Sequence, residues 1–192
     1  MHGQGDVDPD TTRAALRALW QAQREFHVDE RLPLDRALDE REHTGDVDGY
    51  LAELERIMAA EPLDVDAWAH LGNHHLDRAW AAYQRRATRV VAEQLDAAAA
   101  AYQTAVAAVE LSLPIGFNGL LARDKLDNRP VHRALHGLAS ALWWTGQADT
   151  ARAAAETMAW TNPGDTVATM YLRDLDAGLE YPAARALHHD GG

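Results

Sequence analysis

Apolar side chains recur at every third or fourth position along most of the chain, which is the spacing of an amphipathic helix. In the first such stretch, Leu16 and Leu19 share one side of a helix that is expected to begin near Asp10, because an Asp side chain can cap the free amides of a first turn. Residues 1–9 are rich in Gly and Asp, and we expect them to be disordered. The pattern as a whole predicts one all-α domain at residues 10–177.

The helices are predicted to pair into hairpins that repeat with a period of about 34 residues. Glycine marks the turn inside a hairpin, because Gly adopts positive φ without steric cost. The first copy contains Gly45, Leu54, Ile57 and Pro62, and a later copy contains Gly146, Ala155, Met158 and Pro163. We expect repeats at about 31–64, 65–112 and 132–165, then a capping helix at 166–177 and a loose C-terminal tail at 178–192.

The middle repeat is predicted to be longer than the others. Trp68, Leu71 and Gly72 open it in phase, whereas Ala98 and Tyr102 come about four helical turns later than the period requires. We therefore expect two lengthened helices with a bend at residues 86–88.

The added turns carry two aromatic residues. Trp80 and Tyr83 are expected to pack against Val90 and Val91 across the lengthened hairpin. The extra helix surface around these aromatic residues also offers a contact through which the chain could form a homodimer.

A long loop is predicted at residues 113–129, because Pro114 and two glycines interrupt the helical pattern there. In one interpretation the loop covers a binding groove, and Arg129 and Arg133 contact an anionic group of a ligand. Loops of this length are often functional.

In the favoured interpretation the same loop has a structural role. Arg129 or Arg133 pairs with Asp124 or Asp127, and Phe117 fills an apolar gap beside the lengthened hairpin. Packing and surface pairing are the ordinary uses of such residues.

The order Trp68, Leu71, Gly72, then Ala98 and Tyr102, with a closing proline in other units, resembles the tetratricopeptide repeat. Residues 113–143 are also similar to a segment of bacterial repeat proteins of unassigned role. The resemblance implies a short right-handed α-solenoid, in which the first helix of each hairpin lines a concave groove. It also implies a protein that binds a peptide or a segment of another protein.

One subgroup of this family binds the carboxylate tail of a chaperone with Lys, Asn and Arg side chains. The matching positions here are Asp35, Asp39, His70, Arg133 and Gly137, of which only Arg133 has the required charge. Since two carboxylates would repel an anionic tail, we do not expect binding of a chaperone tail.

Composition narrows the class of partner. The formal net charge of −12 argues against nucleic acid, which requires a basic surface. The chain has no cysteine, no apolar stretch typical of a membrane span and no basic-apolar leader pattern at its start, so we expect a cytoplasmic protein without disulfides and without a membrane partner.

The groove predicted from the repeat geometry is acidic with an aromatic patch, which suits a basic peptide with one apolar anchor. The alternative interpretation is an ordinary solvated acidic face. The partner-binding residues that we predict are Asp35, Asp39, Asn73, Asp77, Arg133, His136 and Trp143.

A second hypothesis is a metal-dependent or small-ligand-binding enzyme. His70 and His74 lie four residues apart, as do His132 and His136, and this spacing on a helix is common among ligands of zinc and other divalent ions. A structural role for these histidines is favoured, because no Glu follows the first His as a zincin motif requires. No nucleophile or phosphate-loop motif is present, so a non-catalytic protein is preferred and enzyme activity is left open.

Overall fold

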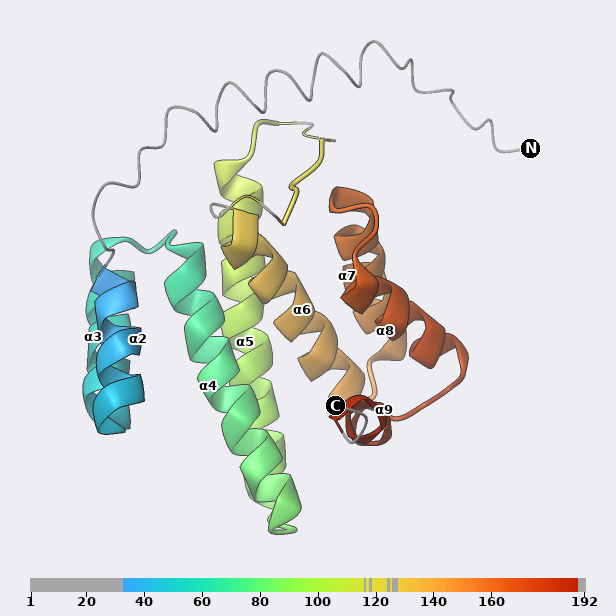
Figure 1. Cartoon of the computed structure of the whole chain (residues 1–192), viewed down its shortest axis with the longest axis horizontal. Coiled ribbons are helices and arrows are strands. Elements are labelled where there is room, and N and C mark those ends of the chain that lie inside the picture. The colour runs from blue at the N-terminus through green and yellow to red at the C-terminus, as the bar shows by residue number, and fades with distance from the viewer. Residues whose placement is uncertain (1–32, 116, 118, 124, 126–127, 190–192) are drawn as a thin grey trace.

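The computed structural model describes residues 33–189, apart from residues 116, 118, 124 and 126–127, and every regular element in the described part is a helix. The predicted helix near Asp10 and the disorder predicted for residues 1–9 fall outside this part. The all-α class is confirmed (Figure 1). The helices are α2 (Pro33–Thr44), α3 (Val47–Ala60), α4 (Val65–Gln84), α5 (Thr88–Ser112), α6 (Arg129–Trp144), α7 (Ala148–Thr161), α8 (Thr166–Asp176) and α9 (Tyr181–His189).

Short polar signals fix the helix boundaries. Asp46, Asp64 and Asp165 precede α3, α4 and α8, and each side chain accepts a hydrogen bond from a first-turn amide. Gly45 and Gly146, in the turns after α2 and α6, have φ values of 73° and 81°. The turns predicted at the glycines are therefore confirmed.

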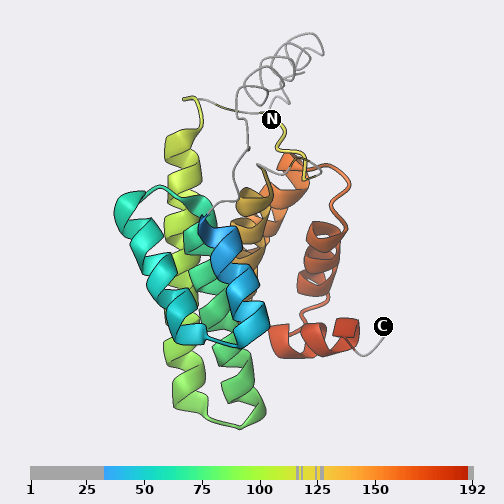
Figure 2. The ribbon, with the colours of Figure 1, turned by 60° about the vertical axis from the view of Figure 1, so that its left-hand side comes forward.

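The second hairpin is long, with 20 residues in α4 and 25 in α5. Its turn contains Arg86, which has a φ of 58° and lies within the predicted bend. In both views the tip of this hairpin extends beyond the neighbouring helices (Figures 1 and 2). The delayed position of Tyr102 in the sequence thus corresponds to extra helical turns on both arms.

Trp80 and Tyr83 have a neighbour that the sequence did not indicate. Their rings stack on each other with centroids 5.5 Å apart, and both meet Trp144 of α6 edge-on. Of the two valines expected beside them, Val91 packs against the buried cluster that includes Leu95 and lines a surface concavity together with Tyr83, while Val90 is exposed. The aromatic pair therefore joins the lengthened hairpin to the following one.

Neighbouring helices pack in chain order. α3 contacts α4, α5 packs against both α4 and α6, and α7 lies against α6 and α8. Alanine fills many of the contact positions and is fully buried at Ala69, Ala105 and Ala139. Small side chains at these positions let the helix axes approach closely.

Tyr102 of α5 fits between two glycines on different helices. Its ring is fully buried, and its hydroxyl donates to Asn73 Oδ1 at 2.7 Å. A Cβ atom added to Gly72 of α4 would lie 2.6 Å from the ring, and one added to Gly137 of α6 would lie closer still. The two glycines therefore make room for one aromatic side chain at the contact of α4, α5 and α6.

The loop before α6 is held in place by hydrogen bonds to its backbone amide and carbonyl groups. Leu121 donates its amide to the Thr161 carbonyl at 2.7 Å, and its own carbonyl accepts from His132 Nε2. The Asn128 side chain donates to the Ala122 carbonyl at 3.0 Å. The pairing predicted with Asp124 or Asp127 involves residues outside the described part, and Arg133 pairs elsewhere, as described below.

The C-terminal segment differs from its prediction as a loose tail. Residues 181–189 form α9, in which Tyr181 and Ala184 are buried against α6. Trp143 fixes the connection before α9, because its indole N–H donates to the Leu179 carbonyl at 2.8 Å. Figure 2 shows α9 lying crosswise below α8.

Gly137→Ala tests the fit of Tyr102. Replacing a helical Gly by Ala ordinarily stabilises a protein by about 1 kcal/mol. Here we expect the free energy of unfolding to fall by about 1–3 kcal/mol, because the new methyl group overlaps the ring. Urea denaturation of Gly137→Ala, Tyr102→Leu and the double variant measures the coupling. A penalty of the same size in the Tyr102→Leu background would contradict this account.

Trp143→Phe tests the attachment of α9. The substitution keeps an aromatic ring but leaves the Leu179 carbonyl without its donor, so we expect a loss of about 1–3 kcal/mol in the free energy of unfolding. Trp160→Phe is the matched control, because Trp160 is 51% exposed, and it should change stability by less than about 0.5 kcal/mol. Equal effects of the two substitutions would argue against the anchoring role.

Candidate functional site

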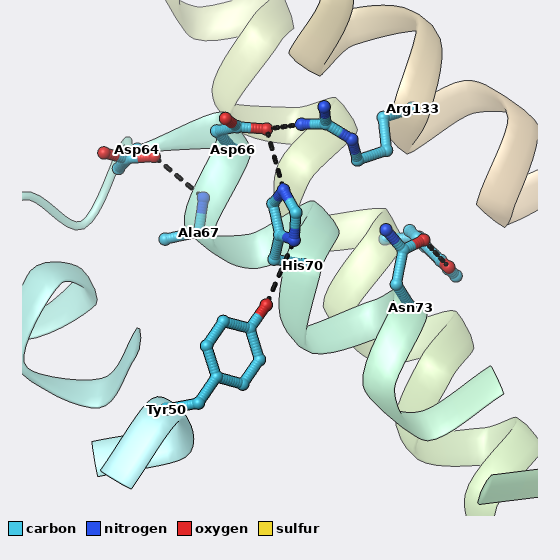
Figure 3. Close-up of polar contacts among 8 residues, drawn as sticks. Tyr50, Asp64, Asp66, Ala67, His70, Asn73 and Arg133 are labelled. Atoms are coloured by element: carbon cyan, nitrogen blue, oxygen red, sulfur yellow. Dashed lines mark hydrogen bonds and ion pairs between the residues drawn. The ribbon is translucent and has the colours of Figure 1, made fainter. Parts of the chain in front are cut away.

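A chain of polar contacts links three successive hairpins. The Tyr50 hydroxyl of α3 lies 3.0 Å from His70 Nδ1 of α4, and His70 Nε2 lies 3.7 Å from Asp66 Oδ1. The same Asp66 oxygen forms an ion pair with Arg133 of α6. Figure 3 shows these side chains pointing toward one another across the helices. Arg133, which was predicted to bind a partner, is thus also part of the helix packing.

Other predicted binding residues on α2 and α4 occupy different environments. Asn73 is partly buried and accepts from Tyr102, so only part of its amide is available (Figure 3). Asp77 is exposed, and Asp39 is half-buried. The side chain of Asp35 lies outside the described part. Of the two predicted carboxylates that the structure describes, Asp77 is therefore the more open to a partner.

Trp143 is not a surface residue. It is 5% exposed, and its ring meets Tyr171 and Tyr181 edge-on at 5.4 and 5.6 Å. The prediction that this ring lines the groove did not include α9, which covers the ring through Tyr181. Trp143 is therefore not an apolar platform for a ligand.

An aromatic patch lies near the C-terminal ends of α4 and α6. Trp80, Tyr83 and Trp144 contact one another, and Arg185 of α9 lies over the Trp80 ring at 4.4 Å from its centroid. Tyr83 keeps 46% of its surface exposed. The sequence indicated this patch through Trp80 and Tyr83, which lie three residues apart. Its contacts with Trp144 of α6 and Arg185 of α9 could not be predicted from the sequence, because these residues are far apart in the chain.

The four histidines proposed as metal ligands each have a separate neighbour. His132 donates to the Leu121 carbonyl, His136 lies 2.7 Å from the Tyr171 hydroxyl, and His70 contacts Tyr50. His74 is buried, with its ring centroid 5.5 Å from that of His75. In the described part of the chain, no three His, Asp or Glu side chains form a group that could hold a metal ion. The structure does not bring the four imidazoles together.

A polar cavity of about 440 Å³ opens where α6, α7, α8 and the preceding loop meet. Three arginines and two histidines contribute to its wall, although the chain carries only 18 Lys and Arg against 30 Asp and Glu. The lining residues are Arg123, Arg129, His132, Arg133, His136, Met158, Asp165 and Val167. The cavity is therefore locally basic in an acidic protein.

Asp165, the carboxylate in this wall, already accepts several hydrogen bonds. Asp165 accepts from the amides of Val167 and Ala168 and from the Asn162 side chain. Burial raises the pKa of this carboxyl group, but those hydrogen bonds outweigh burial and, together with the charge of Arg123, hold the pKa below its usual value. Asp165 is thus an ionised helix cap whose oxygens are occupied.

His136 lies in the same wall and stays neutral. The residue is exposed to solvent, although many protein atoms lie around its ring. Removal from bulk water, followed by the charges of Arg123 and Arg185, lowers its pKa from 6.5 to about 4. At neutral pH, His136 offers a hydrogen-bonding group and no charge.

Among the described helices, none combines the length and the apolar character needed to cross a membrane.

The titration of His136 is a direct test of this environment. We expect its imidazole to titrate near pH 4, well below the ordinary value of 6.5, in ¹⁵N-detected NMR spectra assigned with His136→Gln. The unfolded chain binds this proton at a higher pH than the folded chain does. The contribution of the neutral ring to the free energy of unfolding is therefore complete above pH 6.5 and decreases as the pH falls toward 4. A midpoint between pH 6 and 7 would contradict the assignment.

Comparison with known proteins identifies no family for this chain. No protein-family model matches it, and no curated protein or solved structure is significantly similar to it. The resemblance to the tetratricopeptide repeat therefore remains an interpretation of the sequence pattern. The function has to be argued from the residues and contacts described above.

Proposed function

We propose that the protein is a non-catalytic interaction module, built as a right-handed stack of tetratricopeptide-like hairpins, that binds a peptide or a segment of another protein. The inner face of this stack consists of the sides of α2, α4 and α6 that carry Asp39, Asp77, Arg133 and His136. The packing of α5 against both α4 and α6 supports this arrangement, because a second helix that bridges successive first helices leaves one side of those first helices uncovered.

The observation that carries the proposal is the set of charges around Tyr50. Arg41 of α2 lies over its ring, 4.8 Å from the centroid. Burial raises the pKa of the Tyr50 hydroxyl, Arg41 and Arg133 lower it, and Asp77 raises it further. Charged groups from α2, α4 and α6 therefore lie close enough to act on one hydroxyl. This proximity supports a face shared by all three helices.

The chemistry of the inner face favours a basic segment with one apolar side chain. Asp77 lies one turn before Trp80 on α4, so an exposed carboxylate stands beside the aromatic patch of Trp80, Tyr83 and Trp144. The carboxylate would steer a cationic segment, and the aromatic surface would supply affinity. The apolar anchor is thereby moved from Trp143 to the exposed ring of Tyr83.

Selection from a library of random ten-residue peptides tests this function. We expect the wild type to enrich sequences with Lys or Arg next to one large apolar residue. Asp39→Lys/Asp77→Lys should weaken the binding of a selected peptide by about tenfold or more, because two attractive charges become repulsive. Fluorescence anisotropy with the labelled peptide at fixed ionic strength gives the dissociation constants.

The control variant carries the same change of charge elsewhere. Asp96→Lys/Glu110→Lys reverses two exposed carboxylates on α5, which is not one of the three helices of the inner face. We expect this variant to bind nearly as tightly as the wild type. Equal losses in both variants would show only a net-charge effect, and the proposed face would then be rejected.

A further inference from the structure

We propose that the basic cavity at the start of α6 is a binding site for the phosphate group of a small molecule. This proposal goes beyond the peptide-binding function and does not depend on it. The cavity lies between α6, α7, α8 and the loop before α6, whereas the aromatic patch lies at the other end of α6.

The first step of the argument concerns charge. Within the described part of the chain, the guanidinium groups of Arg123 and Arg129 form no ion pair with a carboxylate, whereas Arg133 pairs with Asp66. Asp165 is ionised and its charge acts on Arg123, so it offsets one positive charge of the wall while its oxygens accept from Val167, Ala168 and Asn162. Among the described residues, Arg123 and Arg129 together therefore leave an excess of positive charge over this one carboxylate.

The second step concerns the start of α6. Arg129 is its first residue, and Asn128 makes no side-chain hydrogen bond to the first-turn amides. α3, α4 and α8 are capped by aspartates, whereas α5 and α7 begin, like α6, without a side-chain cap. Positive partial charge at the beginning of a helix favours an anion there, and the arginines reinforce it.

The third step concerns His132, which lines the cavity and is only 3% exposed. Its Nε2 must carry a proton, because the Leu121 carbonyl to which it bonds can only accept. Its Nδ1 has no hydrogen-bond partner among the described residues, although an unpaired buried nitrogen is costly. A monoprotonated phosphate could supply either a donor or an acceptor for this atom, whereas a carboxylate could only accept.

The donor set explains why phosphate is favoured over a single carboxylate. One arginine fork satisfies the two oxygens of a carboxylate, whereas two forks and a helix start match the additional oxygens of a tetrahedral phosphate. The volume of about 440 Å³ also exceeds that of the phosphate group alone, which leaves room for a small organic substituent. Free phosphate and a phosphate ester share this chemistry.

Isothermal titration of the full-length protein with inorganic phosphate, pyrophosphate and phenyl phosphate tests the site, with acetate as the carboxylate comparison and sodium chloride holding the ionic strength constant. We expect saturable binding of at least one phosphate compound at one site per chain, and tighter binding of phenyl phosphate if the substituent occupies the cavity. Arg123→Gln/Arg129→Gln should weaken this binding by at least about tenfold, because each charge-assisted hydrogen bond contributes that much.

Arg89→Gln/Arg152→Gln is the matched control, since it removes two charges from α5 and α7 outside the cavity. Circular dichroism checks that all variants remain helical. Failure of all three phosphate compounds to bind, binding of acetate with equal affinity, or equal loss in the two double variants would each overturn the proposal. If the wild type binds a phosphate compound but selects no peptide from the library, the inner face is rejected and this site still stands.

Discussion

The fit of Tyr102 between Gly72 and Gly137 is the constraint on which the arrangement of the hairpins depends. The ring comes from α5, while the glycines belong to α4 and α6, so one side chain sets the separation of three helices. Its hydroxyl is satisfied by Asn73, which removes the cost of burying a polar group. With this separation fixed, Asp66 of α4 reaches Arg133 of α6, and the polar contacts continue through His70 to Tyr50.

Much of the fold could be predicted from the sequence, because its signals are local. Gly45 adopts the positive φ that its turn requires, and Asp46 caps the following helix through its own side chain. The length of the second hairpin could also be predicted, because inserted helical turns displace Tyr102 by a whole number of turns. Each of these features depends on residues that are close together in the chain.

The features that the sequence did not predict depend on tertiary contacts. α9 is short, and an isolated helix of that length is marginal in water, so it relies on burial of Tyr181 against Trp143 and Trp144. The basic cavity was anticipated only in part, because Arg129 and Arg133 lie one turn apart on α6 and one interpretation of the sequence gave them an anionic ligand. A net charge of −12 describes the whole surface, whereas Arg123 joins these two arginines where the loop before α6 is held against α7 by the Leu121 amide.

Arg133 connects the two sites that we propose, because it lines the cavity and also pairs with Asp66 in the contact chain that reaches Tyr50. An anion in the cavity that drew the Arg133 guanidinium toward itself would weaken the ion pair between Arg133 and Asp66. The free energy of peptide binding at the inner face would then change. By thermodynamic linkage, a cationic segment that competed for Asp66 would change the affinity of the cavity by the same factor. Arg133 is only partly exposed, so this coupling is screened less by salt than that of a surface pair would be.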